Sequence, residues 1–280
     1  MLDQGQYKRA TMLYAESLAY FRDLNQDWDV ANALNNLGIA LGYCGDYQQA
    51  EGLLEEALRL RNTLGETTSR ARTLDALGVV KHRQGKLDQA EGLHRESLAL
   101  RREIGDARGT AIALNNLGVV ERHRGHYSAA SALIEEALRL RQTVGDNSGV
   151  AISLTDLAEI ARQQDDLQRA WDLYRDALLL RRQLGIYEGF SGCLVGLAGI
   201  AVADGDATRA ARLIGVSDAL RAATQQAVPP VDRADHERIL DAVRASLSPE
   251  DHATATAAGQ AMTLGQAITD ALGGPRSGNV

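Results

Sequence analysis

Asparagine, arginine and histidine recur in this sequence in one fixed register. Asn35 is followed by Asn115, and Asn36 by Asn116, each pair inside the same six letters, ALNNLG. Asn costs a helix interior up to about 0.7 kcal/mol relative to Ala, because its side chain competes for backbone hydrogen bonds. A side-chain amide both donates and accepts, and arginine suits a carboxylate. These residue types predict a site that binds an extended peptide, with a preference for acidic groups.

The candidate residues follow from the faces of the helix that carries ALNNLG. If Leu34, Leu37 and Leu41 face a partner helix, residues seven apart on another side share a second face. Stacked copies would align these positions in rows along one inner wall. The row that begins with Asn35 also includes Thr155 and Val195. The predicted peptide-binding groove comprises Asn35, Asn36, Tyr43, Asp75, His82, Arg83, Asn115, Asn116, Arg122, His123, Asp156, Arg162 and Gln163. In the alternative interpretation, the Asn side chains bond their neighbours across the stack and the arginines are solvated.

Other chemistry finds little support in the sequence. There is no GxSxG elbow, no HExxH and no Walker A loop, so we expect no enzyme activity, no catalytic residues and no cofactors. His123 and His126 are three residues apart, but Gly125 stands between them at a predicted helix break and spoils the spacing of a metal pair. No metal site is therefore expected.

A second set of arginines repeats with the same period, and it allows two interpretations. Such a ladder could follow a nucleic-acid backbone, or it could complement helix C-terminal dipoles and pair with nearby acids such as glutamates. A net charge of -7 favours the second interpretation and argues against direct nucleic-acid binding. The arginines are Arg61, Arg101, Arg141 and Arg181, and the glutamates include Glu55, Glu56, Glu135 and Glu136.

The repeat that positions these residues has a constant length. Its clearest markers are the evenly spaced alanines Ala10, Ala50, Ala90, Ala130, Ala170 and Ala210. Each unit reads as two helices with one apolar stripe apiece. In the unit beginning at residue 27, Gly45 ends the first helix, Asp46 caps the second and Gly65 ends it. Small residues at Gly38 and Ala50 predict a close approach of the two helices.

The pattern Leu34-x2-Leu37-Gly38-x2-Leu41, followed by Ala50-x3-Leu54 and Ala57, resembles the tetratricopeptide repeat, although the usual Trp and Pro are absent. The 40-residue unit is similar to the longer variety of spindle-orientation adaptors and bacterial signalling ATPases. The resemblance implies an all-α fold, a right-handed α-solenoid of stacked helix-turn-helix repeats with a C-terminal helical cap. It also implies that Asn36 and Asn116 hold a ligand backbone. The expected domains are a solenoid over 1–224 (half repeat 1–26, repeats 27–66, 67–106, 107–146, 147–186 and 187–224), a helical capping segment over 225–272 and a disordered tail over 273–280.

The segment after the last repeat has a different sequence pattern. Pro229-Pro230 breaks the chain, and Ser248 with Pro249 opens a further helix. This tail resembles that of actinobacterial regulators that join a STAND ATPase, often with a LuxR-type or SARP-type DNA-binding domain, to a terminal repeat array. The resemblance implies a protein- or peptide-interaction module, the sensor or scaffold arm of such a regulator, with the ATPase and DNA-binding domains outside this chain. The alternative is a free-standing peptide receptor like the Gram-positive pheromone sensors. The half repeat at the N-terminus suggests a chain cut from a longer one.

The tail is also expected to close the groove. The predicted inner positions of the fifth first helix are Val195, Gly196, Gly199 and Ala203, a bare strip that needs a close neighbour. Residues 231–272 are expected to pack there as a capping bundle, so that deletion of 231–280 would expose apolar surface.

Composition fits a globular, cytoplasmic protein. The 280 residues are 45% hydrophobic and 4% aromatic, and no run is long and apolar enough for a membrane span or a signal peptide. Cys44 and Cys193 fit no metal spacing, and we expect both to act as small core residues.

Overall fold

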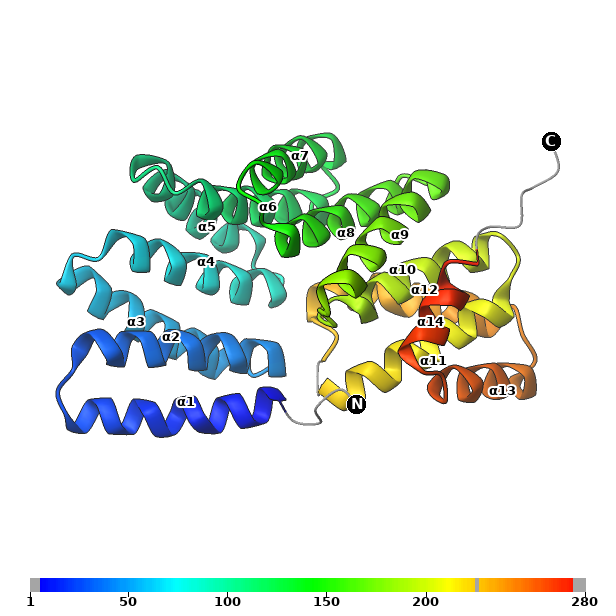
Figure 1. The fold of residues 1–280 in the computed structure, drawn as a ribbon, viewed down its shortest axis with the longest axis horizontal. Coiled ribbons are helices and arrows are strands. Elements are labelled where there is room, and N and C mark those ends of the chain that lie inside the picture. The colour runs from blue at the N-terminus through cyan, green and yellow to red at the C-terminus, as the bar shows by residue number, and fades with distance from the viewer. Residues whose placement is uncertain (1–5, 225–226, 274–280) are drawn as a thin grey trace. The chain divides into compact units, whose positions relative to one another are not determined.

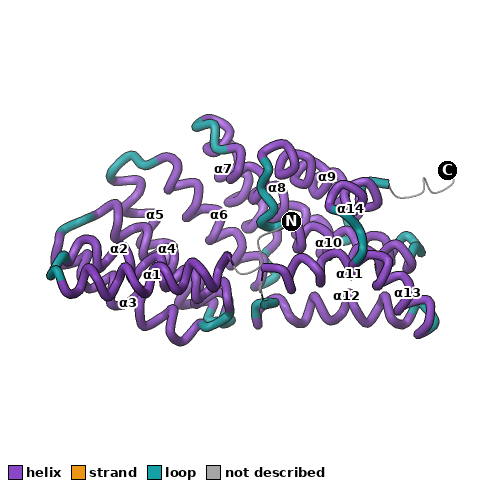
Figure 2. The backbone as a smooth tube through the Cα atoms, turned by 60° about the horizontal axis from the view of Figure 1, so that its bottom comes forward, coloured by secondary structure: helices purple, strands orange, loops and turns teal. Residues whose placement is uncertain are grey.

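The computed structural model describes residues 6–224 and 227–273, and every regular element within them is a helix (Figures 1 and 2). The chain divides into two compact units. Unit 1 contains residues 1–140 and 223–232, and unit 2 contains residues 141–222 and 233–280. The expected all-α fold with stacked helical repeats is confirmed. The predicted disordered tail, residues 273–280, lies outside the described residues apart from Gly273.

Unit 1 is a stack of helix pairs that begins with a single helix. Each helix contacts the next one along the chain from α1 to α6, and each first helix contacts the first helix of the following pair (Figure 1). The elements are α1 (Gln6–Asp23), α2 (Asp27–Cys44), α3 (Tyr47–Leu64), α4 (Thr67–Arg83), α5 (Leu87–Glu103), α6 (Ala107–His123), the start of α7 (Tyr127–Thr143) and the short 3-10 helix η1 (Pro230–Asp232). The expected half repeat is α1.

The helix boundaries follow the predicted caps. Gly45 ends α2 in the left-handed region with φ +90°, and the Asp46 carboxylate accepts the Gln49 N–H at 3.3 Å. A Cβ on Gly38 would lie 2.7 Å from Leu54 Cγ, so the absence of a side chain lets α2 and α3 pack closely. The predicted close approach of the two helices is confirmed.

The repeating arginines join consecutive repeats from inside the stack. Arg61 is fully buried at the end of α3, and it donates to Asn32 Oδ1 (3.0 Å) of its own repeat and to the Ser69 carbonyl and Thr73 hydroxyl of the next. Burial lowers the pKa of Arg61 to about 10. Arg181 likewise donates to a backbone carbonyl of the repeat that follows it, that of Glu188, at 2.5 Å. We call these side chains arginine staples.

The expected pairing with nearby acids holds for Arg101, which binds Asp75 at 2.7 Å and Asp106 at 2.9 Å, but Glu56 and Glu136 bind other arginines. Glu56 is bound by Arg22 at 2.6 Å, and Glu136 by Arg102 at 3.3 Å. A sequence signal for the staples exists and was missed: a small residue follows each arginine by eight positions. These residues are Ser69, Gly109, Gly149 and Gly189. A Cβ on Gly109 would lie 1.6 Å from Arg101 Nη1, so glycine leaves the space the guanidinium needs.

Unit 2 holds the last repeats and the non-repeating tail around one large apolar core. Phe190, Leu194 and Leu213 are fully buried within it. The elements are α8 (Asn147–Gln163), α9 (Leu167–Leu184), α10 (Phe190–Ala203), α11 (Ala207–Thr224), α12 (Arg233–Ala245), α13 (Pro249–Gln260) and α14 (Leu264–Ala271). Ser248 accepts the Asp251 N–H at 3.0 Å and caps α13, as its sequence predicts.

The tail covers α10 and α11 as a helical cap. Ile239 and Val243 of α12 are buried in the same core as α10, and the Cβ position of Gly199 lies 3.4 Å from Ile239 Cδ1. Gly259 of α13 crosses α11 so closely that a Cβ there would lie 2.0 Å from the Arg212 carbonyl oxygen. Gly196 was expected to leave room for the tail, but the absence of a side chain there leaves room for the Tyr174 ring of α9 instead.

Candidate functional site

The first predicted row of polar residues lies inside the stack. Asn35 is fully buried and accepts hydrogen bonds from Thr73 Oγ1 (3.0 Å) and Arg61 Nη1 (3.4 Å). Asp75, one repeat later, binds Arg101 Nη2 at 2.7 Å and accepts from His94 Nδ1 at 3.1 Å. Asn115 is also buried. All three side chains are buried rather than open to a groove, which corrects their predicted place, and the polar atoms of Asn35 and Asp75 bond within the stack.

The second predicted row is partly accessible. Asn36 and Asn116 are half-buried on α2 and α6, and Asn36 Oδ1 accepts from Asn35 Nδ2 at 3.4 Å. Asp156 of this row is half-buried on α8 in unit 2. Thr155, of the first row, is half-buried on the same helix and accepts from the Arg181 staple at 3.3 Å. Ligand contact through Asn36 and Asn116 remains a proposal.

Four basic side chains gather at the C-terminal ends of α4 and α6 in unit 1. We call His82, Arg83, Arg122 and His123 the basic row. His82 Nε2 lies 2.9 Å from His123 Nδ1, and the two rings meet edge to face with centroids 4.6 Å apart. The Arg122 side chain is 9% exposed and the His123 side chain 10%. Positive groups at helix C-termini also meet the negative end of the helix dipole.

Arg83 extends the basic row toward the preceding repeat. Its Nη1 donates to the Gly42 carbonyl of α2 at 3.2 Å, and its guanidinium lies 4.4 Å from the centre of the Tyr43 ring. The row therefore crosses the ends of three successive first helices, α2, α4 and α6. The structure brings together Tyr43, His82, Arg83, Arg122 and His123 of the predicted set.

A segment of the chain's own tail is bound to the basic row. We call residues 227–232 the strap. The Ala227 methyl lies 3.4 Å from the Cβ position of Gly45 at the end of α2, and η1 packs against α4. At the other end, Asp232 Oδ1 lies 2.9 Å from His123 Nε2 and 3.8 Å from Arg122 Nη2. The strap thus follows the three helix ends in turn.

The electrostatics of this contact favour an ionised carboxylate. Burial works to raise the pKa of Asp232, but the hydrogen bond from His123 and the charges of His123 and Arg122 outweigh it and lower the pKa. Burial and the neighbouring His123 lower the pKa of His82 to about 3, so His82 is neutral near pH 7.

Asp232 was not among the predicted partners of the basic row. The Pro229-Pro230 break was visible, and an acidic residue closely follows it. Charge complementarity between that residue and the predicted Arg and His rows was the available signal.

The remaining predicted basic residue lies in unit 2. Arg162 Nη2 binds Glu159 at 2.8 Å and also pairs with Asp235 of α12. Burial works to lower the pKa of Arg162, but Glu159, Tyr174 and Asp235 outweigh it and raise the pKa. Gln163 is half-buried on the same helix. Arg162 is therefore held by the cap.

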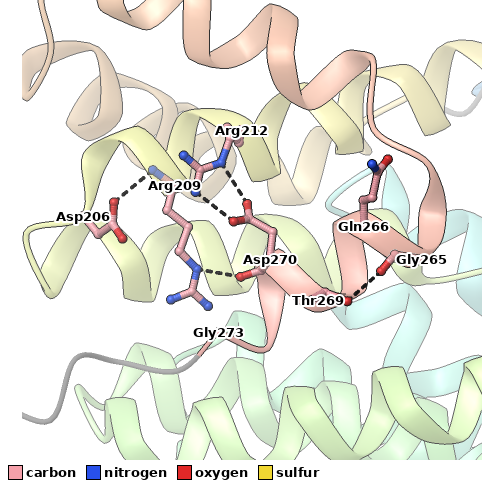
Figure 3. A pocket seen from close by; sticks show the side chains of 8 residues that line it. All are labelled: Asp206, Arg209, Arg212, Gly265, Gln266, Thr269, Asp270 and Gly273. Atoms are coloured by element: carbon pink, nitrogen blue, oxygen red, sulfur yellow. Dashed lines mark hydrogen bonds and ion pairs between the residues drawn. The ribbon is translucent and has the colours of Figure 1, made fainter.

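Two cavities in the described residues offer weaker sites. One of about 570 Å³ in unit 2 is lined by Arg209, Arg212 and Asp270 (Figure 3). Its arginines are already engaged, since Arg212 binds Asp270 at 2.8 Å and Arg209 donates to the Asp270 and Ala271 carbonyls at 2.8 and 2.5 Å. The other, of about 560 Å³, lies among α1, α2 and α3 and is lined mainly by apolar side chains such as Met12 and Leu53.

The described part of the chain shows neither a metal-type cluster nor a membrane-length apolar helix. No cluster of three or more His, Cys, Asp or Glu side chains within residues 6–224 and 227–273 could hold a metal ion. No helix in that part of the chain is both long and apolar enough to cross a membrane.

Comparison with solved structures shows similar folds at low sequence identity. BtubC from P. vanneervenii is 22% identical with a TM-score of 0.57, over 78% of this chain and 92% of that one. A Pyrococcus horikoshii STAND protein with a tetratricopeptide repeat sensor is 17% identical with a TM-score of 0.56, and the match covers 96% of this chain but 41% of that one. The apo form of RapI is 11% identical with a TM-score of 0.55, over 87% of this chain and 98% of that one.

Sequence comparison identifies the repeat itself. No curated protein matches the chain. The family model of the tetratricopeptide repeat matches residues 1–63, 69–143 and 109–183, which together exceed half of the chain. These matched segments contain most of each helix pair from α2 to α9. With the stacked helix pairs and their glycine caps, this match shows that the chain belongs to the tetratricopeptide repeat family.

Proposed function

We propose that this chain is a peptide-binding interaction module and that its binding site is the basic row of unit 1. One observation carries the proposal: the strap already lies against the row, with its carboxylate held by His123 and Arg122. The row is built from residues on successive repeats, so a bound peptide would cross several helix ends. Stacked repeats commonly present such extended binding surfaces.

The ligand is a protein segment with at least one acidic side chain. Arginine binds carboxylates through charge-assisted hydrogen bonds, which are stronger than neutral ones. The half-buried amides of Asn36 and Asn116 are available on the same first helices to hold a peptide backbone. The module has no activity of its own in this proposal and acts through its partner.

A peptide-display library panned on the full chain tests this function. The selected peptides should be rich in Asp or Glu and should bind at least ten times more weakly to the double variant Arg83→Gln/Arg122→Gln. The matched control is Arg95→Gln/Arg102→Gln, because those side chains are 69% and 56% exposed. Equal binding to both double variants would show that the basic row is not the site.

The wider role we propose is that of a sensor or scaffold arm in a cytoplasmic, STAND-type signalling or transcriptional regulator. The fold likeness to a STAND protein with a tetratricopeptide repeat sensor, which spans 96% of this chain, supports this role. Sequencing the coding region upstream of Met1 tests it, and a Walker A nucleotide-binding loop in the same reading frame is the expected result. A stop codon shortly before Met1 would instead favour the free-standing peptide receptor.

A further inference from the structure

One carboxylate, that of Asp232, makes the charged contacts between the strap and the basic row. None of the three residues of η1 is buried, and the Asp232 side chain is 40% exposed. The turn itself is closed by a backbone hydrogen bond from the Asp232 N–H to the Pro229 carbonyl at 3.0 Å. Val228, Pro229 and Val231 are half-buried, so the strap gains only part of the hydrophobic stabilisation that full burial would give. Its position therefore also depends on the ion pairs and hydrogen bond of Asp232.

The basic row keeps its own internal contacts without the strap. Arg83 is fixed by the Gly42 carbonyl and the Tyr43 ring, and both lie on α2. His123 Nδ1 lies within hydrogen-bonding distance of both His82 Nε2 (2.9 Å) and the Val119 carbonyl (3.0 Å). A site whose side chains are fixed before binding pays less ordering entropy when a ligand arrives.

We infer that the strap is a displaceable internal ligand of this module and that the external partner is an acidic peptide of the same chemistry. That chemistry is a short turn-forming segment with a carboxylate two residues after a proline, as in Pro230-Val231-Asp232. This inference rests on the proposed function of the basic row and adds both the class of the ligand and its regulation. At rest the site is closed, and the partner must compete with the strap.

Competition with a tethered segment has a quantitative signature. A tethered ligand acts at an effective concentration near the millimolar range, so it masks its site even when its intrinsic affinity is modest. The apparent affinity of an external peptide equals its intrinsic affinity multiplied by the fraction of molecules in which the site is open. Weakening the strap without changing the row should therefore tighten external binding.

The experiment uses the full chain and a fluorescein-labelled peptide with the sequence of residues 227–234, AVPPVDRA. Fluorescence anisotropy would compare the unmodified chain with Asp232→Asn, which removes the charge of the strap. Loss of a charged hydrogen-bond partner should tighten peptide binding by about tenfold or more. The matched control is Asp241→Asn on α12, whose side chain is 73% exposed and should leave binding unchanged.

A second measurement needs no variant of the protein. Hydrogen exchange in the unmodified chain should speed up at the Asp232 amide when excess peptide displaces the strap, because the bond to the Pro229 carbonyl is then released. The same peptide with Asn in place of Asp should have no effect on exchange and should bind at least tenfold more weakly.

The two proposals fail in different ways. Equal peptide binding by the unmodified chain and Asp232→Asn, with unchanged exchange at Asp232, would overturn the displaceable strap. If panning nevertheless yields peptides that require Arg83 and Arg122, the proposed binding function stands alone. If no selected peptide depends on the basic row in either protein, both the function and the inference are overturned.

Discussion

His123 Nε2 lies 2.9 Å from Asp232 Oδ1, although the two residues are 109 positions apart in the sequence. His123 ends the first helix of a repeat, whereas Asp232 ends the short 3-10 turn before the non-repeating tail. The hydrogen bond therefore joins the periodic part of the chain to a part that carries no repeat. The contact holds the pKa of the Asp232 carboxyl below its usual value, because His123 donates to it and Arg122 lies nearby.

Unit 1 should lose stability as the pH falls from about 6.5 toward 3. The folded-state pKa of His82 is lowered to about 3, so between pH 6.5 and 3 the imidazole binds a proton in the unfolded chain but not in the folded chain. The charged and titratable groups around His82 are His123, Asp232, Arg122 and His94. The pKa of Asp232 is also lowered, so protonation of its carboxylate at the acidic end of this pH range destabilises the fold further. One such group changes stability by at most about 1.4 kcal/mol per pH unit.

Urea unfolding at pH 7, 6 and 5 measures this dependence. His82→Gln should flatten it between pH 6.5 and 5, whereas His126→Gln, at a side chain that is 62% exposed, should leave it unchanged. A slope unaffected by His82→Gln would contradict the assignment of the proton uptake to this imidazole.

The arginine staple Arg101 should matter far more than its neighbour Arg102. Arg101 is buried and binds Asp75 at 2.7 Å, so Arg101→Ala leaves a buried carboxylate without its cation and should cost about 3–5 kcal/mol. Arg102 pairs with Glu136 at the surface, and Arg102→Ala should cost about 1 kcal/mol or less. Denaturant unfolding of the two variants gives the comparison, and similar losses would refute the structural role of the staple.

Two glycines within helices should respond to alanine with opposite signs. Gly118 of α6 has Ile134 Cγ1 2.4 Å from its Cβ position, so Gly118→Ala should destabilise unit 1 by about 1–3 kcal/mol through overpacking. Gly92 of α5 has open space at its Cβ position, so Gly92→Ala should stabilise the fold by about 0.4–1 kcal/mol. Thermal melting distinguishes these outcomes, and a stabilising Gly118→Ala would show that α6 and α7 are not packed as described.

The cap should loosen when the crossing of α11 and α13 is widened. A Cβ on Gly259 would lie 2.0 Å from a backbone oxygen of α11, which no side-chain rotation can relieve. Gly259→Val should therefore detach α13 and raise protease cleavage there, while Gly265→Ala, at a position with open space, should not. Cleavage rates that match in both variants would mean that the close backbone approach is not needed for the cap.

The period of the sequence was enough to predict the helix pairs and their ends. Positions such as Gly38, Gly45 and Asp46 have local requirements, a close approach, a positive φ or a cap, that only a few residue types meet. The cap was also predictable, because the strip around Gly199 needed a close neighbour, and Ile239 supplies it.

The binding residues were harder to predict because a periodic polar position has two possible roles. Asn35 and Arg61 occupy repeating polar positions, as Arg122 does, yet the first two bond each other in the interior. Helical periodicity shows which residues share a face, but not whether the next repeat covers that face. The strap was outside any period, so its contact with His123 depended on the path of the chain after Pro230, which no local pattern determines.

The arginine staples place the same side chain at four successive joints between repeats. Each has its arginine in one repeat and its small partner residue eight positions later in the next, as in Arg61 with Ser69 and Arg181 with Gly189. Copying any block one full period long therefore regenerates a complete joint at both seams, wherever the cut is made. A gene for such an array can grow or shrink by whole blocks through unequal recombination, and each new joint keeps its arginine and its small partner residue.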